Sequence, residues 1–270
     1  MKFFLSFIIT FIFTANCFAT GPVKRKRVQL IPTYSYSRSN NYFDKQGQIT
    51  PLGNNTHYVS HYLGLYSTIL LSKRLDLLAN IPIMNQRLTT NGVLASKTGI
   101  GDISLGVAYH FPSTDLTKFL TLKAVFIFPA YQNTISPYLG YGEKAIQLGA
   151  IYSLNPTEKT YLAVEGNYTR YLDEVSGPTQ YLISGTFGCN LNDFEKLTFN
   201  FSHQLSRSSD NSFNTNLAIN KDFVLGKLSA AYGRRISRMV TPYAQLTLTP
   251  YGYNAGSSFS FSIYAIIKMP

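Results

Sequence analysis

The chain of 270 residues contains no tryptophan, only two cysteines and few charged residues. Asp, Glu, Lys and Arg make up 14% of it, which is low for a soluble domain of this length. Beyond the N-terminus it also lacks the ~20 consecutive apolar residues that a membrane-spanning helix needs. The nearest candidate, residues 119–130, is interrupted by Thr121 and Lys123. These absences argue against both an α-helical membrane protein and an ordinary soluble globule.

The N-terminus carries one positive charge at Lys2, then an apolar stretch over residues 3–15, then small residues ending at Ala19. This order is typical of a cleavable secretory signal peptide, which we predict over residues 1–19. The apolar stretch is shorter than a spanning helix, so an uncleaved anchor is disfavoured. Residues 20–270 contain no long linker or low-complexity tract and are predicted to form one domain.

Export bears on the cysteines as well. An acylated lipoprotein cysteine at Cys17 is a weaker alternative to the signal peptide, because Asn16 stands where a small residue is wanted. Cleavage after Ala19 leaves Cys189 as the remaining cysteine, so no intrachain disulfide is expected.

Acidic residues are scarce: the chain has 13 Asp and Glu against 24 Lys and Arg, which gives a net charge of +11. Such a basic balance suits nucleic acid, anionic lipid or an anion-conducting lumen, and export argues against nucleic acid as a partner. The one short basic cluster, Lys24–Arg27, is interpreted as a solvated tail, with contact to anionic lipid or a barrel mouth as the alternative.

What the sequence does contain is alternation with period two, supported by 20 Tyr and 19 Phe. In residues 102–111, apolar side chains at odd positions oppose small or polar ones at even positions, and residues 196–206 and 257–269 repeat the pattern. Twelve segments alternate in this way or are otherwise consistent with strands, most of them near the 9 to 11 residues that cross a bilayer at a tilt. They are 27–37, 57–71, 75–88, 99–111, 119–130, 144–154, 160–171, 179–190, 196–206, 212–221, 225–237 and 257–269. The fold predicted is an all-β antiparallel transmembrane barrel of about twelve strands, with ten or fourteen open because residues 240–251 also fit a strand.

The connections between these segments alternate in length, as they do in bacterial outer-membrane barrels. The short set is predicted to face the periplasm: 72–74, 112–118, 155–159, 191–195 and 222–224. The long set is predicted to lie outside: 38–56, 89–97, 131–143 and 238–256. Residues 173–178 and 207–211 are short although they belong to the outer set. The C-terminus, Lys268-Met269-Pro270, departs from the aromatic ending usual in such barrels, and a soluble periplasmic β-sandwich or propeller stays as the alternative fold.

The segment TGIGDISLGVAYHF resembles an outer-membrane family linked to the meta-pathway of phenol degradation, whose strands open with Gly-x-Gly-Asp, here Gly99, Gly101 and Asp102. Leu105, Gly106 and Tyr109 continue the match, and Leu75–Pro82 resembles that family's upstream hairpin. The resemblance implies a barrel that passes small, often hydrophobic or aromatic compounds. The residues themselves predict a sharp strand start at the glycines and an Asp102 side chain bonded to nearby backbone.

We find no pattern for catalysis, a cofactor or a metal. A lipid hydrolase on the barrel wall would place His-x-Ser on one strand, and none of the four histidines is followed in this way. His203 and Ser206 come nearest, but three residues apart on a strand they face opposite ways. The chain is therefore predicted not to be an enzyme, with a lipid hydrolase as the least favoured alternative.

Charged residues within the predicted strands are expected to face the lumen, because Arg or Lys in lipid costs ~2–4 kcal/mol near the bilayer midplane. The candidate lumen-lining residues are Asp102, Lys123, Glu165, Lys227 and Arg235. Lys123 and Glu165 are expected to form a polar network, which serves either transport or only structure. The function predicted is an outer-membrane channel or diffusion transporter for small solutes, with lipid and solute as partners. A structural or surface-interaction barrel with a filled lumen is the alternative, and no oligomeric state is predicted.

Overall fold

The computed structural model describes residues 28–53, 55–134, 136–172 and 177–270. The expected signal peptide over residues 1–19 and the basic cluster Lys24–Arg27 lie outside these ranges. Within them, no helix has the length and apolar character to cross a membrane.

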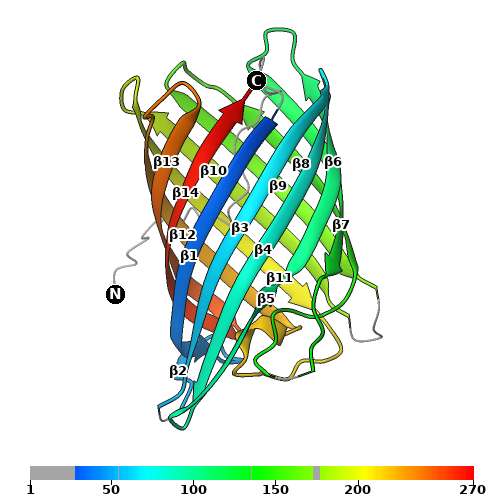
Figure 1. Ribbon diagram of the computed structural model, residues 1–270, viewed down its shortest axis with the longest axis vertical. Helices are drawn as coiled ribbons and strands as arrows, with labels where there is room; N and C mark the ends of the chain where they lie inside the picture. The colour runs from blue at the N-terminus through cyan, green and yellow to red at the C-terminus, as the bar shows by residue number, and fades with distance from the viewer. Residues whose placement is uncertain (1–27, 54, 135, 173–176) are drawn as a thin grey trace, which may run out of the picture.

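The strands form one antiparallel sheet that closes on itself, because the last strand, β14, pairs with the first, β1 (Figure 1). The short strand β2 (Ile49–Pro51) pairs only with β1, and β5 (Val93–Ile100) pairs only with β4. The other twelve make the barrel wall and confirm the predicted fold. They are β1 (Val28–Phe43), β3 (His57–Ser72), β4 (Leu75–Thr90), β6 (Asp102–Pro112), β7 (Lys118–Pro129), β8 (Ala145–Leu154), β9 (Thr160–Tyr171), β10 (Thr179–Asn190), β11 (Glu195–Arg207), β12 (Phe223–Arg234), β13 (Val240–Tyr253) and β14 (Ala255–Met269).

The two ends of the barrel differ in their connections (Figure 1). One end, here called the turn end, holds Pro270 and five connections: 73–74, 113–117, 155–159, 191–194 and 235–239. The opposite end, the loop end, holds β2, β5 and the connections 130–144, 172–178 and 208–222. The predicted alternation of short and long connections therefore holds for most of the chain.

Two predictions about the last third were wrong. Residues 212–221 are not a strand: they belong to the 208–222 loop and contain the 3-10 helix η1 (Leu217–Ile219). Asn214 and Asn216 accept hydrogen bonds from backbone two residues ahead, an alternative to strand pairing that asparagine offers. Residues 240–253 form β13, which confirms the further strand left open over 240–251, and the predicted loop 238–256 and turn 222–224 do not exist as such.

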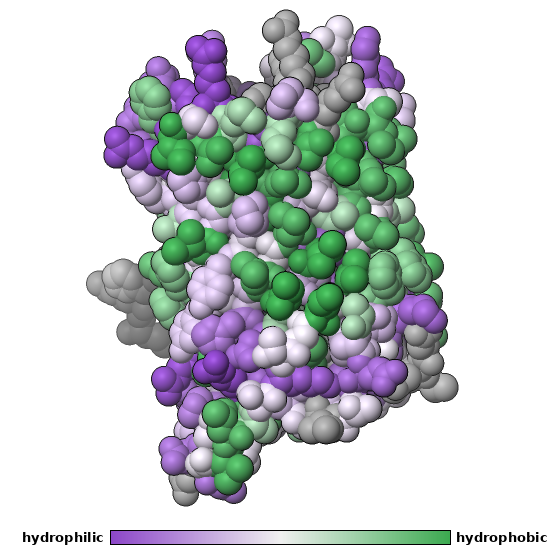
Figure 2. Space-filling view, viewed as in Figure 1, coloured by the Kyte–Doolittle hydropathy of each residue, from purple (hydrophilic) through white to green (hydrophobic). Residues whose placement is uncertain are grey.

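The apolar faces of the strands point outward. On β6, Leu105, Tyr109 and Phe111 are exposed, whereas Ala108 and His110, between them, are buried. Figure 2 shows the consequence: a broad hydrophobic belt covers the middle of the barrel and gives way to hydrophilic residues towards both ends. A belt of this kind matches the hydrocarbon layer of a bilayer, so the outer surface is built for lipid.

Candidate solute pathway in the barrel lumen

The inward face of the barrel is lined mainly by small polar side chains. Members on β7, β8 and β10 to β13 include Thr121, Ser153, Thr186, Asn200, Ser229 and Gln245, all of them buried. Hydroxyl and amide groups can bond one another or water, and a lumen of this type suits polar filling or passage. The lumen is therefore the candidate functional site, and its turn-end and loop-end halves are built differently.

Aromatic rings narrow the turn-end half. The rings of Tyr243 and Tyr264 stack with centroids 4.9 Å apart and an interplanar angle of 10°. Both are buried and pack in one cluster with Ile31 and Ala231, against which Tyr66 also packs. Sequence reasoning missed this cluster, because Tyr243 was placed in a loop and the inward face was expected to be polar.

Lys123 and Glu165, which were predicted to meet, form an ion pair in this half of the lumen. The Lys123 ammonium donates to Glu165 Oε1, and Asn167 Nδ2 donates to the same oxygen at 2.7 Å. The strand between them, β8, carries Gly149 opposite Lys123, and a Cβ there would collide with Lys123 and Asn167. The two side chains are 12% and 5% exposed, so the pair is deeply enclosed.

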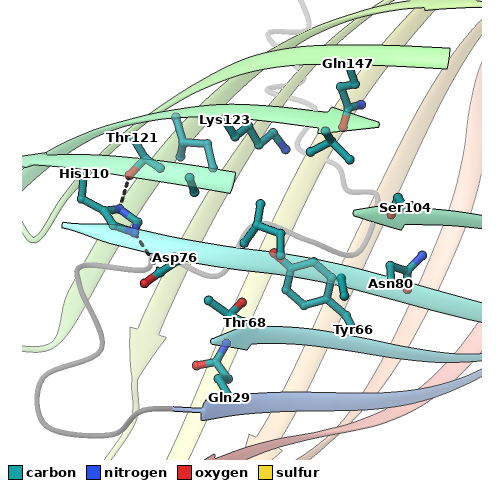
Figure 3. Close-up of a pocket in the computed structure, with 15 residues that line it drawn as sticks. Gln29, Tyr66, Thr68, Asp76, Asn80, Ser104, His110, Thr121, Lys123 and Gln147 are labelled. Atoms are coloured by element: carbon teal, nitrogen blue, oxygen red, sulfur yellow. Dashed lines mark hydrogen bonds and ion pairs between the residues drawn. The ribbon is translucent and has the colours of Figure 1, made fainter. Parts of the chain in front are cut away.

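A second buried cluster lies nearby and was not predicted (Figure 3). His110 Nε2 lies 2.9 Å from Asp76 Oδ2, and His110 Nδ1 lies 2.8 Å from Thr121 Oγ1. Because a carboxylate only accepts, Nε2 carries the proton it donates to Asp76. A His-x-Ser motif within one strand does not indicate this cluster, because its members come from three strands, β4, β6 and β7. At no more than 2% exposure these residues brace adjacent strands.

The loop end is covered by two loops that bind each other, 130–144 and 208–222, here called the cap. The Tyr141 hydroxyl donates to the Asn220 carbonyl at 2.7 Å and accepts from Gln180 Nε2 at 3.2 Å. Lys221 Nζ lies 3.2 Å from Glu143 Oε1, an ion pair between the same two loops. Burial raises the pKa of Tyr141, so its hydroxyl keeps its proton and remains a donor.

The Gly-x-Gly-Asp segment positions the first of these loops. The Tyr131 hydroxyl donates to Asp102 Oδ1 at 2.8 Å, so the Asp102 side chain binds a loop side chain and not the backbone that was expected. A Cβ on Gly99 would lie 2.9 Å from Leu139 of the same loop. Burial and the neighbouring Asp102 carboxylate raise the pKa of Tyr131, which keeps this donor protonated.

Lys227 and Arg235, both on the predicted list, lie in different surroundings. Lys227 lies on β12 and lines a cavity under the cap. Arg235 lies past the end of β12, in a turn at the turn end, where it is exposed and its guanidinium carbon lies 5.3 Å from the centre of the Phe194 ring. The strand ends at Arg234, and for this reason Arg235 stands outside the barrel wall.

Cavities lined by described residues lie in both halves of the lumen. The turn-side cavity, drawn in Figure 3, is lined by polar residues that include Thr68, Asn80, Gln147 and Lys123. The loop-side cavity holds about 790 Å³ of empty space, part of it open solvent, and Lys227 is on its wall. Among the residues placed in the structure, no group of three or more His, Cys, Asp or Glu side chains is arranged to hold a metal ion.

A closed antiparallel barrel with an apolar outer belt and a polar interior defines the class of outer-membrane β-barrel proteins. Within that class, the chain belongs to the family described as "Putative MetA-pathway of phenol degradation", whose model matches residues 39–263. This confirms the resemblance seen at Gly99, Gly101 and Asp102. None of the curated proteins matches the chain by sequence.

Solved structures agree with the fold. An outer membrane channel from Pseudomonas putida F1 is 14% identical with a TM-score of 0.73, over 93% of this chain and 100% of that one. The NanC porin is 11% identical with a TM-score of 0.56, over 89% of this chain and 100% of that one. A FadL homologue from Pseudomonas aeruginosa is 8% identical with a TM-score of 0.50, over 91% of each chain. At these identities the likeness shows the barrel fold.

Proposed function

We propose that this chain is a channel through which small solutes diffuse across the outer membrane, with hydrophobic or aromatic compounds as its main class. The observation that carries the proposal is the polar inward face with two cavities in series, one under the cap and one towards the turn end. A barrel of twelve strands lies between small filled barrels and open porins, which suits a narrow conduit.

Two findings support the solute class and the direction of the channel. The family description names phenol degradation, and phenols are small aromatic compounds. The loop end faces outward in this proposal and the turn end faces the periplasm, as in other barrels of this class. Solutes then meet the cap and Lys227 first, and the Lys123–Glu165 pair and the stacked tyrosines afterwards.

A second candidate is a structural barrel with a filled lumen. The stacking of Tyr243 on Tyr264, and the enclosure of Lys123 by Glu165, favour it, because side chains already occupy the turn-end half. On this account the exposed loops, not the lumen, carry the function.

Permeation of solutes into reconstituted vesicles separates the two candidates. Swelling of liposomes containing the barrel is measured with sugars of increasing size. Entry of labelled phenol is measured in vesicles with a lipopolysaccharide outer leaflet, which slows its passage through lipid. If the barrel is a channel, phenol enters vesicles that contain it faster than vesicles that lack it, and small sugars enter faster than large ones. Equal rates with and without the barrel, for every solute, would reject the channel and favour the filled barrel.

A further inference from the structure

Several charged groups that line or cover the lumen are matched with a partner. Lys123 is paired with Glu165, Asp76 with His110, and Lys221 of the cap with Glu143. Across the described ranges, Lys227 has no hydrogen-bond or ion-pair partner, although it lies well inside β12 and lines the loop-side cavity. An ammonium group that is partly buried without a counter-charge is unfavourable, so the cavity favours a ligand that supplies one.

Local backbone geometry distinguishes Lys227 from its neighbours on β12. The pairing of β12 with β13 shifts register between Gly226 and Leu228, where Lys227 alone lies opposite two residues of β13, Thr249 and Pro250. A bulge of this kind, here on β13, interrupts the ladder opposite Lys227, and bulges occur often beside functional sites. The position is therefore built differently from the regular wall around it.

Hydroxyl groups stand on the same cavity wall. Ser37 and Ser60 are directly opposite each other on β1 and β3, and both line the cavity with Lys227. In the part of the chain that is placed, neither hydroxyl has a hydrogen-bond partner. Two adjacent free hydroxyls and an ammonium are donors of the kind that a carboxylate accepts.

The rest of the wall is mixed: Ser39, Tyr58, Gln86, Asn220 and Ser258 are polar, and the other side chains are apolar. Leu217, from the 3-10 helix of the cap, lies over the cavity, and Phe223, Leu225 and Met84 line it as well. An inorganic anion gains nothing from these side chains, whereas an aromatic or aliphatic body buries apolar area against them, at roughly 25 cal/mol per Å². The wall thus combines one positive charge, hydroxyl donors and a hydrophobic surface.

We infer that the loop-side cavity binds small monocarboxylates with an apolar body, and that Lys227 binds their carboxylate. Aromatic acids fit this class, with the carboxylate on the ammonium and the ring against Leu217 and Phe223. A role of this site in uptake rests on the proposed channel function. Binding of the carboxylate does not itself require conduction.

Equilibrium binding to the full chain in mild detergent tests the inference. Benzoate is the probe, acetate tests the need for an apolar body, and benzyl alcohol tests the need for the charge, each followed by calorimetry. We expect benzoate to bind at least 10-fold more tightly than either of the others. Lys227→Met should lose at least 10-fold in benzoate affinity, and Lys227→Arg should retain most of it. Lys118→Met removes an equal charge from an exposed position at the turn end and should bind as the parent does.

The outcomes separate the site from the channel. Equal benzoate affinity in the parent and Lys227→Met, with both folded by heat-dependent gel mobility, would overturn the inference. If Lys227→Met does not fold, the benzoate affinity of Lys227→Gln is measured instead. The parent protein is also compared with benzoate and with benzyl alcohol, and equal affinity for these two ligands would overturn the inference. Benzoate binding without solute entry into vesicles would reject the channel and keep the site. Solute entry without benzoate binding would do the reverse.

Discussion

Two inward lysines of the barrel wall, Lys123 towards the turn end and Lys227 towards the loop end, differ in their surroundings. Lys123, in the turn-end half, is paired with Glu165 and supported by Asn167, with Gly149 leaving room for the contact. Lys227, in the loop-end half, lines an open cavity beside hydroxyl and apolar side chains. A matched charge holds strands together and narrows the lumen, whereas an unmatched one is available to a solute. The role of a charged side chain on the barrel wall, structural or solute-binding, can therefore be assigned only when its partners are known.

The largest expected effect comes from the aromatic stack in the turn-end half. Tyr243→Ala removes a buried ring and should lower the free energy of unfolding by about 3–5 kcal/mol, as buried aromatic truncations do. Conductance should rise, because the ring narrows the lumen. Urea unfolding in detergent and planar-bilayer recording measure the two effects. Tyr181→Ala, on the outward face, is the matched control and should leave conductance unchanged.

Breaking the matched pair comes next in size. Glu165→Gln leaves Lys123 enclosed without its counter-charge, which should cost about 3 kcal/mol in the free energy of unfolding and make the channel more anion-selective. The double variant Lys123→Met with Glu165→Leu should recover most of the lost stability, since it removes both charges. Urea midpoints and reversal potentials in a salt gradient provide the measurements. Unchanged selectivity in Glu165→Gln would leave the pair with a structural role alone.

A smaller effect is expected at the cap. Tyr141→Phe removes the hydroxyl that donates to Asn220, which should cost about 1 kcal/mol locally and increase the frequency of current fluctuations. The turn-end half should keep its properties. Hydrogen exchange of residues 208–222 checks the local loss, and equal exchange in the parent and the variant would show that the hydroxyl does not hold the cap.

The smallest effect is a pH dependence confined to the cap. Burial raises the pKa of Tyr141 above its ordinary value of 10.0, so its proton is held more tightly in the folded state. The stability that this group contributes is fully present below pH 10 and is lost as the pH rises through the raised value. Current fluctuations should therefore increase on going from pH 9 to the most alkaline pH that the bilayer tolerates, about pH 11. Tyr141→Phe should show a smaller increase, because Tyr131, whose pKa is also raised, still anchors the same loop.

Period-two alternation predicted most of this fold, because one face of each strand meets lipid and the other meets polar groups. It failed where local side-chain bonding decides the structure. Residues 212–221 contain asparagines that bond nearby backbone, and β13 was obscured by its prolines, Pro242 and Pro250.

The candidate site was predicted less completely. Lys123 and Glu165 were brought together correctly, since charges avoid lipid and both lie deep in their strands. The Asp76–His110–Thr121 cluster and the tyrosine stack were missed, because each depends on the exact register between paired strands. Single-strand motifs carry no information about such cross-strand neighbours.

Single-channel recording of the purified full chain in a planar bilayer tests the central claim most directly. A channel with an aromatic narrowing predicts discrete, small current steps for the parent protein and larger steps for Tyr243→Ala. If both proteins show the heat-dependent gel mobility of a folded barrel yet neither passes current above the bare bilayer, the lumen is closed and the channel account is contradicted.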